Sequence, residues 1–589
     1  MKLHSLWEII EHRASATPDA QAYTFLEDGE RDGDALTWAD VAVRSRNLAA
    51  AIAQSTRPCA RVLLLFPPGL EFAPAFFGSL RARTIAVLAY PPAGSRADRV
   101  IARLRGVAAD ARFSLVVAPG SVFARRETVA TLVPELAGVP WLNSDDATAS
   151  SARIDRDTPD AADVAFLQYT SGSTSKPRGV MVTHGNLLHN LAASARLANH
   201  DPGSIAVTWL PVNHDMGLID GVLQPAFSGF PAWIMSPAAF LQRPARWLQA
   251  ISRLRATHSG GPDFAYGLCA ARVSANDRAA LDLGTWRIAY NGSEPVRYAT
   301  MEQFQRAFGE CGFRWEAFRP AYGLAESTLL VTSSGANEEP HVLHADVDAL
   351  RSGNAEPAGA ARQSIPLVSC GSATSGTEVA IVDPVRLTRC SPGRVGEIWV
   401  HGASVAAGYW QSEDVSIATF GAQIAEGDER RFLRTGDLGF LRGGHLFVTG
   451  RIKDLLIVRG VKHYPQDVEH TVERAHASIR PHGTAAFNHQ PNGQPSIAIV
   501  AEIARHSEKG MWAQSELSAI CAADAQAVCA AHGFVPGTIA LVEAGAVPRT
   551  TSGKTERYRC PALLDDGAVL LYTWTPGSAL DGARRRAAS

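Results

Sequence analysis

The sequence predicts an α/β protein with a large N-terminal domain and a small α+β C-terminal domain joined by a hinge. Three observations predict this architecture. The chain has 589 residues, 46% of them hydrophobic, which is ample for a large core but too long for one compact domain. Short β-rich apolar runs alternate with helical patterns, which predicts several subdomains with parallel-rich sheets. The pattern changes after the Gly443 and Gly444 turn, and the remaining chain is long enough for a second domain.

The first elements follow the order strand, helix, strand. Ser5 and Glu8 have the spacing of a capping box before an amphipathic helix. Strands are expected at 62–66, 85–90 and 115–118, with a helix over 71–83 between the first two. Because parallel strands need a crossover connection, this order implies parallel sheets covered by helices.

Composition argues against several classes of partner. The 56 basic and 58 acidic residues nearly balance, and no long basic block is present, so nucleic acid is not expected as a partner. The most apolar region, 70–90, contains Glu71, Arg81 and Arg83, which argues against stable membrane insertion. Eight scattered cysteines without a CxxC pair indicate neither a zinc site nor a disulfide framework. A cytoplasmic protein without a signal peptide is therefore expected.

A hydroxyl-rich loop lies between two expected strands, 164–169 and 180–182. Short side chains let backbone N–H groups surround a polyphosphate, and Lys176 and Arg178 add positive charge. A plain surface turn is the alternative, and a Walker A loop is excluded because the spacing of its glycines and lysine is absent. Thr183 or Asn186 can cap the following helix. The loop residues are Thr170, Ser171, Gly172, Ser173 and Thr174.

The run TSGSTSKPRG resembles the phosphate loop of the adenylate-forming superfamily, which includes acyl-CoA synthetases, luciferases and peptide-synthetase adenylation domains. Ser175 replaces the usual glycine, and Arg178 replaces the usual lysine. A planar guanidinium group therefore takes the place of a compact ammonium group at position 178. The resemblance implies that ATP is a substrate and that this loop holds its pyrophosphate.

Two further motifs of the same family follow in order. The run AYNGSEP at 289–295 resembles the adenine-proximal segment, and AYGLAES at 321–327 resembles the Y-G-x-T-E motif with Ala325 in place of threonine. In the family, the tyrosine stacks on adenine and the glutamate helps hold Mg²⁺, which suits an aromatic face and a hard oxygen ligand. The residues implied are Gly292, Ser293, Glu294, Ala321, Tyr322 and Gly323 for the nucleotide, and Glu326 for the metal.

Three motifs lie in the last third of the chain. RTGDL at 434–438 resembles the ribose motif, with Asp437 as its carboxylate. GRIKD at 450–454 resembles the hinge motif, which implies a hinge at Lys453 and domains at 1–452 and 453–589. PRTTSGK at 548–554 resembles the C-terminal catalytic loop and its lysine. The catalytic residues implied are Lys554, His214 and Arg451, and Arg451 is also expected to bind the nucleotide.

Three segments resemble fatty acyl-AMP ligases more closely than general acyl-CoA synthetases: LPVNHDMGL, SGGPDFAY and HYPQDVE. Amino-acid adenylation domains typically show F-D-x-S where this chain has HDMG. The family often has asparagine where Asp263 stands. Ordinary core is the alternative interpretation for the aromatic and aliphatic residues of this region. The substrate-binding residues expected are Trp209, His214, Asp215, Gly261, Pro262 and Phe264.

The connection between Glu326 and Gly371 is long and contains a polar, Gly/Ala/Ser-containing stretch near 351–363. Unstructured connections beyond roughly 12–15 residues are uncommon in compact domains and are often functional. Fatty acyl-AMP ligases resemble this chain in carrying an insertion here, which is associated with poor use of coenzyme A. A tolerated surface insertion is the alternative.

The resemblance implies ATP-dependent and Mg²⁺-dependent activation of a medium- or long-chain fatty acid to an acyl-adenylate, with release of pyrophosphate. The acyl group would then pass to the phosphopantetheine thiol of an acyl carrier protein, or of a carrier domain in a polyketide or peptide synthase. One alternative is a fatty acyl-CoA synthetase that uses free CoA. Another is a catalytically dead adenylate-binding scaffold protein, although Glu326, Asp437, Arg451 and Lys554 are all retained.

Overall fold

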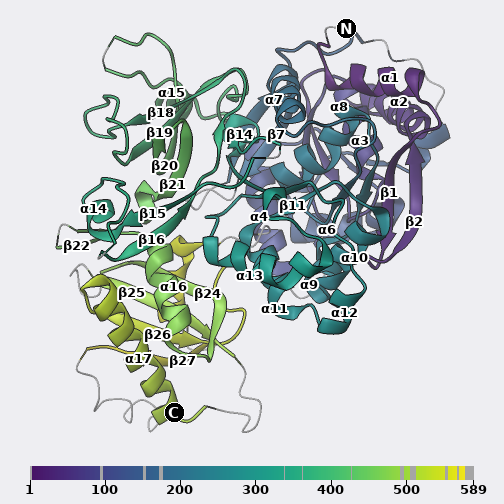
Figure 1. Ribbon diagram of the computed structural model, residues 1–589. Coiled ribbons are helices and arrows are strands. Elements are labelled where there is room, and N and C mark those ends of the chain that lie inside the picture. Colours follow the sequence, from purple (N-terminus) through teal and green to yellow (C-terminus); the bar gives the residue numbers. More distant parts are fainter. Residues whose placement is uncertain are drawn as a thin grey trace.

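The structure is a computed structural model, and the predicted α/β architecture is confirmed (Figure 1). Two large sheets with covering helices form the first part of the chain, a third sheet follows, and a small sheet with two helices lies at the C-terminal end. The structure describes residues 3–92, 97–149, 154, 156–170, 177–336, 338–360, 362–425, 427–459, 461–490, 496–504, 512–550, 555–566 and 569–576.

The six-stranded sheet has the order β6-β5-β3-β4-β7-β8. Its strands are β3 (Arg61–Leu65), β4 (Ile85–Ala89), β5 (Leu115–Ala118), β6 (Trp141–Asn143), β7 (Val164–Thr170) and β8 (Arg178–Thr183). The first five are parallel and β8 is antiparallel to β7. The predicted βαβ order with parallel strands is therefore confirmed. Helix α3 (Phe72–Arg81) is shorter than predicted: it begins after Glu71, which makes no capping hydrogen bond with its side chain, and it ends before Arg83, which adopts a left-handed φ of 52°.

The nine-stranded sheet has the order β17-β14-β13-β12-β11-β9-β10-β1-β2. Its strands are β1 (Gln21–Glu27), β2 (Arg31–Thr37), β9 (Ala206–Thr208), β10 (Ala232–Ile234), β11 (His258–Gly261), β12 (Ile288–Asn291), β13 (Phe318–Gly323), β14 (Leu330–Ser333) and β17 (Ser372–Ala373). The inner strands from β1 to β13 are parallel, so their carboxyl ends lie at one edge of the sheet. Such an edge is where open α/β sheets bind ligands.

Helices cover both sheets, and local caps fix where several of them begin. The helices are α1 (Leu6–Ala16), α2 (Trp38–Ser55), α4 (Ala97–Ala111), α5 (Gly120–Phe123), α6 (Arg126–Leu132), α7 (His184–Leu197), α8 (Gln224–Ser228), α9 (Pro237–Gln242), α10 (Ala245–Leu254), α11 (Asp263–Arg272), α12 (Ala275–Ala279) and α13 (Tyr298–Phe308). Thr183 caps α7 and Asn186 completes the box. At α1, Ser5 caps as predicted, but Glu8 accepts the N–H of His4 rather than that of Ser5.

The third sheet and the stretch predicted to be an insertion pack together. The sheet contains β18 (Thr377–Val382), β19 (Gly396–Gly402), β20 (Leu433–Arg442) and β21 (His445–Arg451), with α15 (Glu413–Phe420) beside it. The preceding stretch is folded, with β15 (Val342–Asp346), α14 (Val347–Arg351) and β16 (Ser364–Val368). It is not an unstructured polar connection, because Leu350 and Ala355 are buried against Phe440 and Phe447.

The C-terminal part has its own core. It contains β22 (Leu456–Val458), β23 (Val461–His463), α16 (Pro465–Ala475), β24 (Ile479–His489), β25 (Ser496–Ile503), α17 (Gln514–His532), β26 (Thr538–Val542) and β27 (Leu570–Trp574). Two of its buried apolar clusters consist only of residues from Leu456 onward. Tyr464 is an exception, since it packs against Phe440 and Phe447 of the third sheet. None of the helices in the described ranges is long and apolar enough to cross a membrane.

Asp524 on α17 yields a prediction about pH and stability. Its side chain is fully buried, neither oxygen has a hydrogen-bond partner among the described residues, and burial raises its pKa from 3.8 to about 7. The folded state therefore holds this proton more tightly than the unfolded state, so Asp524 costs stability as pH rises from about 4 to about 7.

We expect Asp524→Asn to flatten the pH dependence of the melting temperature over this window and to melt higher than wild type at pH 7.5. Thermal unfolding from pH 5 to pH 8 measures this, with Asp19→Asn, an exposed aspartate, as the matched control. Parallel melting profiles of wild type and Asp524→Asn would contradict the prediction.

Candidate active site

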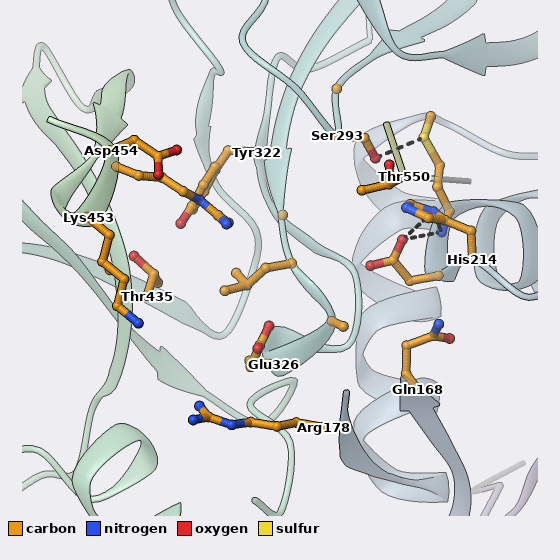
Figure 2. A pocket seen from close by; sticks show the side chains of 18 of the residues that line it. Gln168, Arg178, His214, Ser293, Tyr322, Glu326, Thr435, Lys453, Asp454 and Thr550 are labelled. Atoms are coloured by element: carbon orange, nitrogen blue, oxygen red, sulfur yellow. Dashed lines mark hydrogen bonds and ion pairs between the residues drawn. The ribbon is translucent and has the colours of Figure 1, made fainter. Parts of the chain in front are cut away.

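A cavity of about 710 Å³ lies at the carboxyl edge of the nine-stranded sheet, and residues of the six-stranded sheet, the third sheet and the C-terminal part also line it (Figure 2). Figure 2 shows Thr435 and Lys453 on one side of it and His214 and Thr550 on the other. The C-terminal part also contributes Phe487 to the lining. The cavity is therefore built from segments that are far apart in the sequence.

A carboxylate holds two predicted nucleotide-binding residues together. The hydroxyl of Tyr322, at the end of β13, donates to Oδ2 of Asp437 at 2.8 Å. The guanidinium of Arg451, at the end of β21, donates from Nε to Oδ1 at 2.6 Å. Tyr322 and Arg451 line the cavity, whereas Asp437 lies just behind the lining. Burial and the carboxylate raise the pKa of Tyr322, so the phenol stays protonated and donates.

Glu326 lies on the cavity wall with Arg178 close by (Figure 2). Tyr409 donates its hydroxyl to Oε1 of Glu326 at 2.8 Å, and the Arg178 guanidinium lies 5.4 Å from the centre of the Tyr409 ring. Oε2 of Glu326 has no hydrogen-bond partner among the residues that the structure describes. A carboxylate oxygen facing a cavity is a suitable ligand for a hard cation such as Mg²⁺.

His214 and Asp215 begin the segment that leads from the cavity into the core. Nδ1 of His214 is 2.7 Å from Oδ1 of Asp215, which also accepts the N–H of Met216 at 2.7 Å. The next residues form a π-helix, η4 (Met216–Leu223), a conformation that is rare and frequent at functional sites. Ser293 donates to the sulfur of Met216 across the cavity (Figure 2).

Four of the predicted substrate-binding residues lie outside the cavity lining: Trp209, Gly261, Pro262 and Phe264. Trp209 is only 3% exposed and stacks on Phe240 with ring centres 4.0 Å apart. A Cβ atom at Gly261 would lie 2.9 Å from the Trp209 ring, and Phe264 meets this ring edge-on. Trp209 belongs to the core and Phe264 packs against it, in line with the alternative interpretation for the aromatic residues.

The predicted nucleotide-binding residues divide into three groups. Gly292, Ser293, Ala321, Tyr322, Gly323 and Arg451 line the cavity, as do Glu326 and Lys453. Glu294 does not, because its carboxylate turns away and accepts the N–H of Phe264 at 2.7 Å, where burial raises its pKa to about 7. Thr170 ends β7, whereas Ser171, Gly172, Ser173, Thr174 and Lys554 lie outside the described residues. The described neighbours Thr550 and Thr555 line the cavity.

The cavity also contains residues that no motif indicated. Arg103 on α4 donates to the carbonyl of Tyr169 at 3.0 Å and faces Glu556 and Tyr558 of the C-terminal part. No local pattern distinguishes Arg103 from other arginines of an amphipathic helix. Asp220 on η4 also lines the cavity. A signal for Asp220 was present, since it is a single acid in the apolar run MGLIDGVL.

The lining fits a nucleotide with a polyphosphate chain. Arg103, Arg178, Arg434 and Arg451 supply positive charge, and an aromatic ring is present at Tyr322. Gly436 adopts a φ of 70°, and no atom lies within 4 Å of where its Cβ would stand, so the backbone is open to a ligand there.

Comparisons with known proteins agree with this geometry. The family model of AMP-binding enzymes matches residues 10–410, and the model of the Disco-interacting protein 2-like AMP domain matches residues 453–563. The medium-chain-fatty-acid–[acyl-carrier-protein] ligase JamA of Moorena producens is 41% identical over 96% of each chain. The long-chain-fatty-acid–AMP ligase FadD23 of Mycobacterium tuberculosis is 36% identical, over 93% of this chain and 94% of its own.

A similar solved structure is the fatty acyl-adenylate ligase of L. pneumophila in complex with acyl adenylate and pyrophosphate. It is 36% identical, covers 98% of each chain, and has a TM-score of 0.74.

Gly323 yields a prediction about the wall of the cavity. A Cβ atom at this position would lie 1.9 Å from the carbonyl oxygen of Leu329, so Gly323→Ala must displace the turn between β13 and β14. We expect the free energy of unfolding to fall by roughly 1–3 kcal/mol, as for other overpacked sites. Gly69→Ala is the matched control, because no atom lies within 4 Å of its Cβ position. Equal melting temperatures of the two variants would contradict the prediction.

Proposed function

The chain belongs to the AMP-binding enzyme family, and on this premise we propose that it is a fatty acyl-AMP ligase. It activates a medium- or long-chain fatty acid with ATP, releases pyrophosphate, and transfers the acyl group to the phosphopantetheine thiol of an acyl carrier protein. One observation carries this proposal: residues from β12, β13, β20, β21 and the C-terminal part converge on one cavity. Carrier-protein and AMP ligases similar to it over nearly the whole chain support the substrate and the acceptor.

In the first step, a carboxylate oxygen of the fatty acid bonds to the α-phosphorus of ATP. The bond from this phosphorus to the bridging oxygen breaks, and its electron pair leaves with pyrophosphate. Both reactants are anions, so positioning and cationic stabilisation carry most of the catalysis. We assign Lys554 as the cation that bridges the carboxylate and the α-phosphate, and the loop 170–174 as the part that holds pyrophosphate. Arg103 and Arg178 line the cavity and are suited to the polyphosphate.

The nucleoside half is held by the residues around Asp437. Tyr322 covers one face of the adenine between Gly292 and Ala321. Asp437 keeps a lone pair on each oxygen beyond its bonds to Tyr322 and Arg451, and its side chain is 8% exposed, so it can also accept hydrogen bonds from the ribose hydroxyls. Tyr322 and Arg451 already fix the orientation of this carboxylate. Glu326 is the proposed ligand of Mg²⁺, which neutralises phosphate charge when bound. His214, held by Asp215, orients the fatty acid carboxylate.

In the second step, residues 453–589 rotate about Lys453. This movement withdraws Lys554 and admits the carrier thiol, whose sulfur attacks the acyl carbonyl as AMP leaves. Two features support a mobile C-terminal domain: its separate apolar clusters, and a second family model that begins at residue 453. The eight cysteines are free thiols, which supports a cytoplasmic location for the protein and its carrier.

Product analysis tests the function. The enzyme is incubated with ATP, Mg²⁺ and a ladder of fatty acids, alone, with free CoA, or with a phosphopantetheinylated carrier protein. We expect acyl-AMP without an acceptor, acyl-carrier product with the carrier, and little acyl-CoA. Efficient acyl-CoA formation would contradict the proposed acceptor, and no acyl-AMP with any acid would contradict the proposed function.

We predict that Lys554→Ala lowers the rate of acyl-AMP formation by about 10²–10³-fold, the usual loss when one group that stabilises transition-state charge is removed. ATP binding, followed by equilibrium titration, should change little. Lys462→Ala, an exposed lysine of the same part of the chain, is the matched control. Near wild-type turnover of Lys554→Ala would show that this lysine is not catalytic.

The folded insertion offers a physical reason for the proposed preference for a carrier thiol over free CoA. Arg351, the last residue of α14, donates to the carbonyl of Ala531 near the end of α17 at 2.7 Å. The insertion is therefore tied to the C-terminal part that must rotate. Its other arginine, Arg362, pairs with Asp346 at 3.1 Å inside the insertion itself.

We predict that Arg351→Ala raises the ratio of acyl-CoA to acyl-AMP formed with free CoA, and that deletion of 345–366 raises it further. Arg362→Ala, which leaves the link to Ala531 intact, should leave the ratio close to that of wild type. If all three variants keep the wild-type ratio, the insertion does not control the acceptor.

A further inference from the structure

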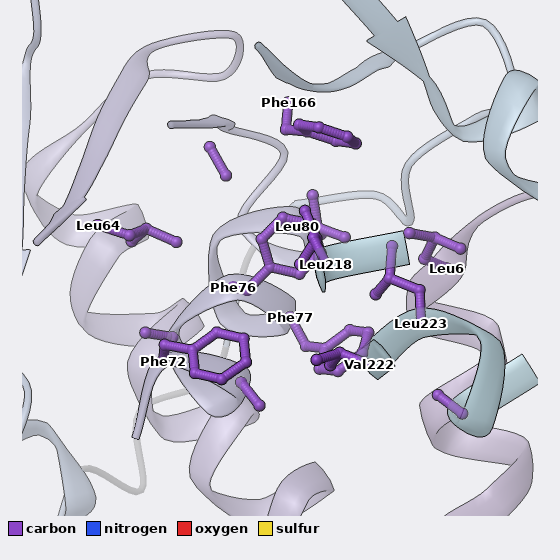
Figure 3. Packing of buried hydrophobic residues seen from close by; sticks show 14 of the residues in the cluster. Leu6, Leu64, Phe72, Phe76, Phe77, Leu80, Phe166, Leu218, Val222 and Leu223 are labelled. Carbon is purple, nitrogen blue, oxygen red and sulfur yellow. The ribbon is translucent and has the colours of Figure 1, made fainter. Parts of the chain in front are cut away.

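One aspartate in the wall of the cavity, Asp220, has no role in the proposed reaction. Asp220 lies in the middle of η4, whose other residues are apolar or glycine. Figure 3 shows Leu218 and Val222 of this helix packed against Phe76 and Phe77 of α3. Asp220 faces the other way, because it lines the cavity. One face of η4 is therefore anchored in the core while the carboxyl group of Asp220 faces the substrate space.

The carboxyl group of Asp220 has no protein partner in the part of the chain that the structure describes. Neither a hydrogen bond nor a salt bridge reaches it, and burial raises its pKa from 3.8 to about 7. A buried polar group without a partner costs stability, and native proteins keep few of them. Such a group facing a cavity is available to a ligand.

A second, small cavity adjoins Asp220 on the side away from the nucleotide. Its volume is about 10 Å³, near the minimum for one water molecule, and its lining includes Asp220, Gln224, His200 and His258. Both ring nitrogens of His200 and Nε2 of His258 lack hydrogen-bond partners among the described residues. Burial lowers the pKa of His200 to about 4, so this ring is neutral at pH 7. Asp220 therefore lies between the large cavity and a small one that is lined in part by polar side chains.

On the proposed function, Asp220 lies on the expected path of the acyl chain. Tyr322, which is proposed to bind the nucleotide, and Thr435 line the cavity on the side of the third sheet. From His214, beside the reacting carboxylate, η4 leads in the opposite direction into the core. An acyl chain that extends from the carboxylate along η4 therefore passes Asp220.

We propose that Asp220 is an acyl-specificity residue, whose carboxyl group binds a hydrogen-bond donor, a hydroxyl or amino group, carried on the chain of the activated fatty acid. This inference rests on the proposed function. An unsubstituted chain would cover the carboxyl group and leave it unpaired, whereas a donor on the chain would satisfy it. Sites built to bind a polar substituent reject the analogue that lacks it more strongly than apolar pockets discriminate by size.

The test compares kcat/KM for pyrophosphate release with decanoate and with its monohydroxy and monoamino derivatives, substituted at successive carbons. We expect wild type to prefer at least one substituted acid over decanoate by about tenfold or more. In Asp220→Leu this preference should fall by about 10–100-fold, mostly because decanoate becomes a better substrate. Asp220→Asn should retain a preference for hydroxyl but lose one for amino, which distinguishes the two donors.

Asp19→Leu, the same change at an exposed site, is the control, and the melting temperature of each variant checks that it folds. Pyrophosphate release with the same substituted-to-unsubstituted ratio in wild type, Asp220→Leu and Asp220→Asn would overturn the inference and leave the proposed function standing. A wild-type preference for decanoate over every substituted acid would also overturn it. No pyrophosphate release with any acid would overturn the proposed function, and the inference with it.

Discussion

The Asp437 carboxylate connects the strands on which the site is built. It accepts one hydrogen bond from Tyr322 on β13 and one from Arg451 on β21, and it lies on β20 itself. The nine-stranded sheet and the third sheet are thereby joined at the cavity wall. Both donors line the cavity, so their positions depend on a carboxylate behind them. Because charge-assisted hydrogen bonds are short and directional, this link fixes the position of both donors in the cavity wall.

The same link lies directly before the segment that leads to the C-terminal part. Arg451 ends β21, and Lys453 follows two residues later in the cavity lining. Beyond this point the contacts that cross to the rest of the protein include polar ones, such as the pair Arg297–Glu473 at 3.2 Å and the Arg351–Ala531 hydrogen bond. Polar contacts exchange for water at smaller cost than an apolar core, so they suit an interface that opens and closes.

Motif residues could be located from the sequence because each motif is local and its chemistry is carried by residue type. Tyr322, Glu326, Arg451 and Lys453 come together in the lining of one cavity, and their individual roles stay predictions. The βαβ order was also predictable, since it follows from short apolar runs separated by helical patterns. Trp209 was misplaced because a buried aromatic residue and a pocket-lining one look alike in sequence, and only packing on Phe240 distinguishes them.

Some features depend on tertiary packing, and the local sequence gives little or no indication of them. Arg103 reaches the cavity because α4 packs near β8, which its own sequence does not indicate. The folded insertion was missed because two buried side chains, Leu350 and Ala355, order a stretch whose composition is polar. Asp220 was visible as an acid in an apolar run, but its importance depends on the cavity that it faces.

The most direct test of the central claim, that this cavity makes an acyl-adenylate, is exchange of labelled pyrophosphate into ATP without any acceptor. The account predicts exchange that requires Mg²⁺ and a fatty acid together, because adenylate formation is then the only step and it runs in both directions. Exchange without a fatty acid, or no exchange with fatty acids from short to long, would contradict it.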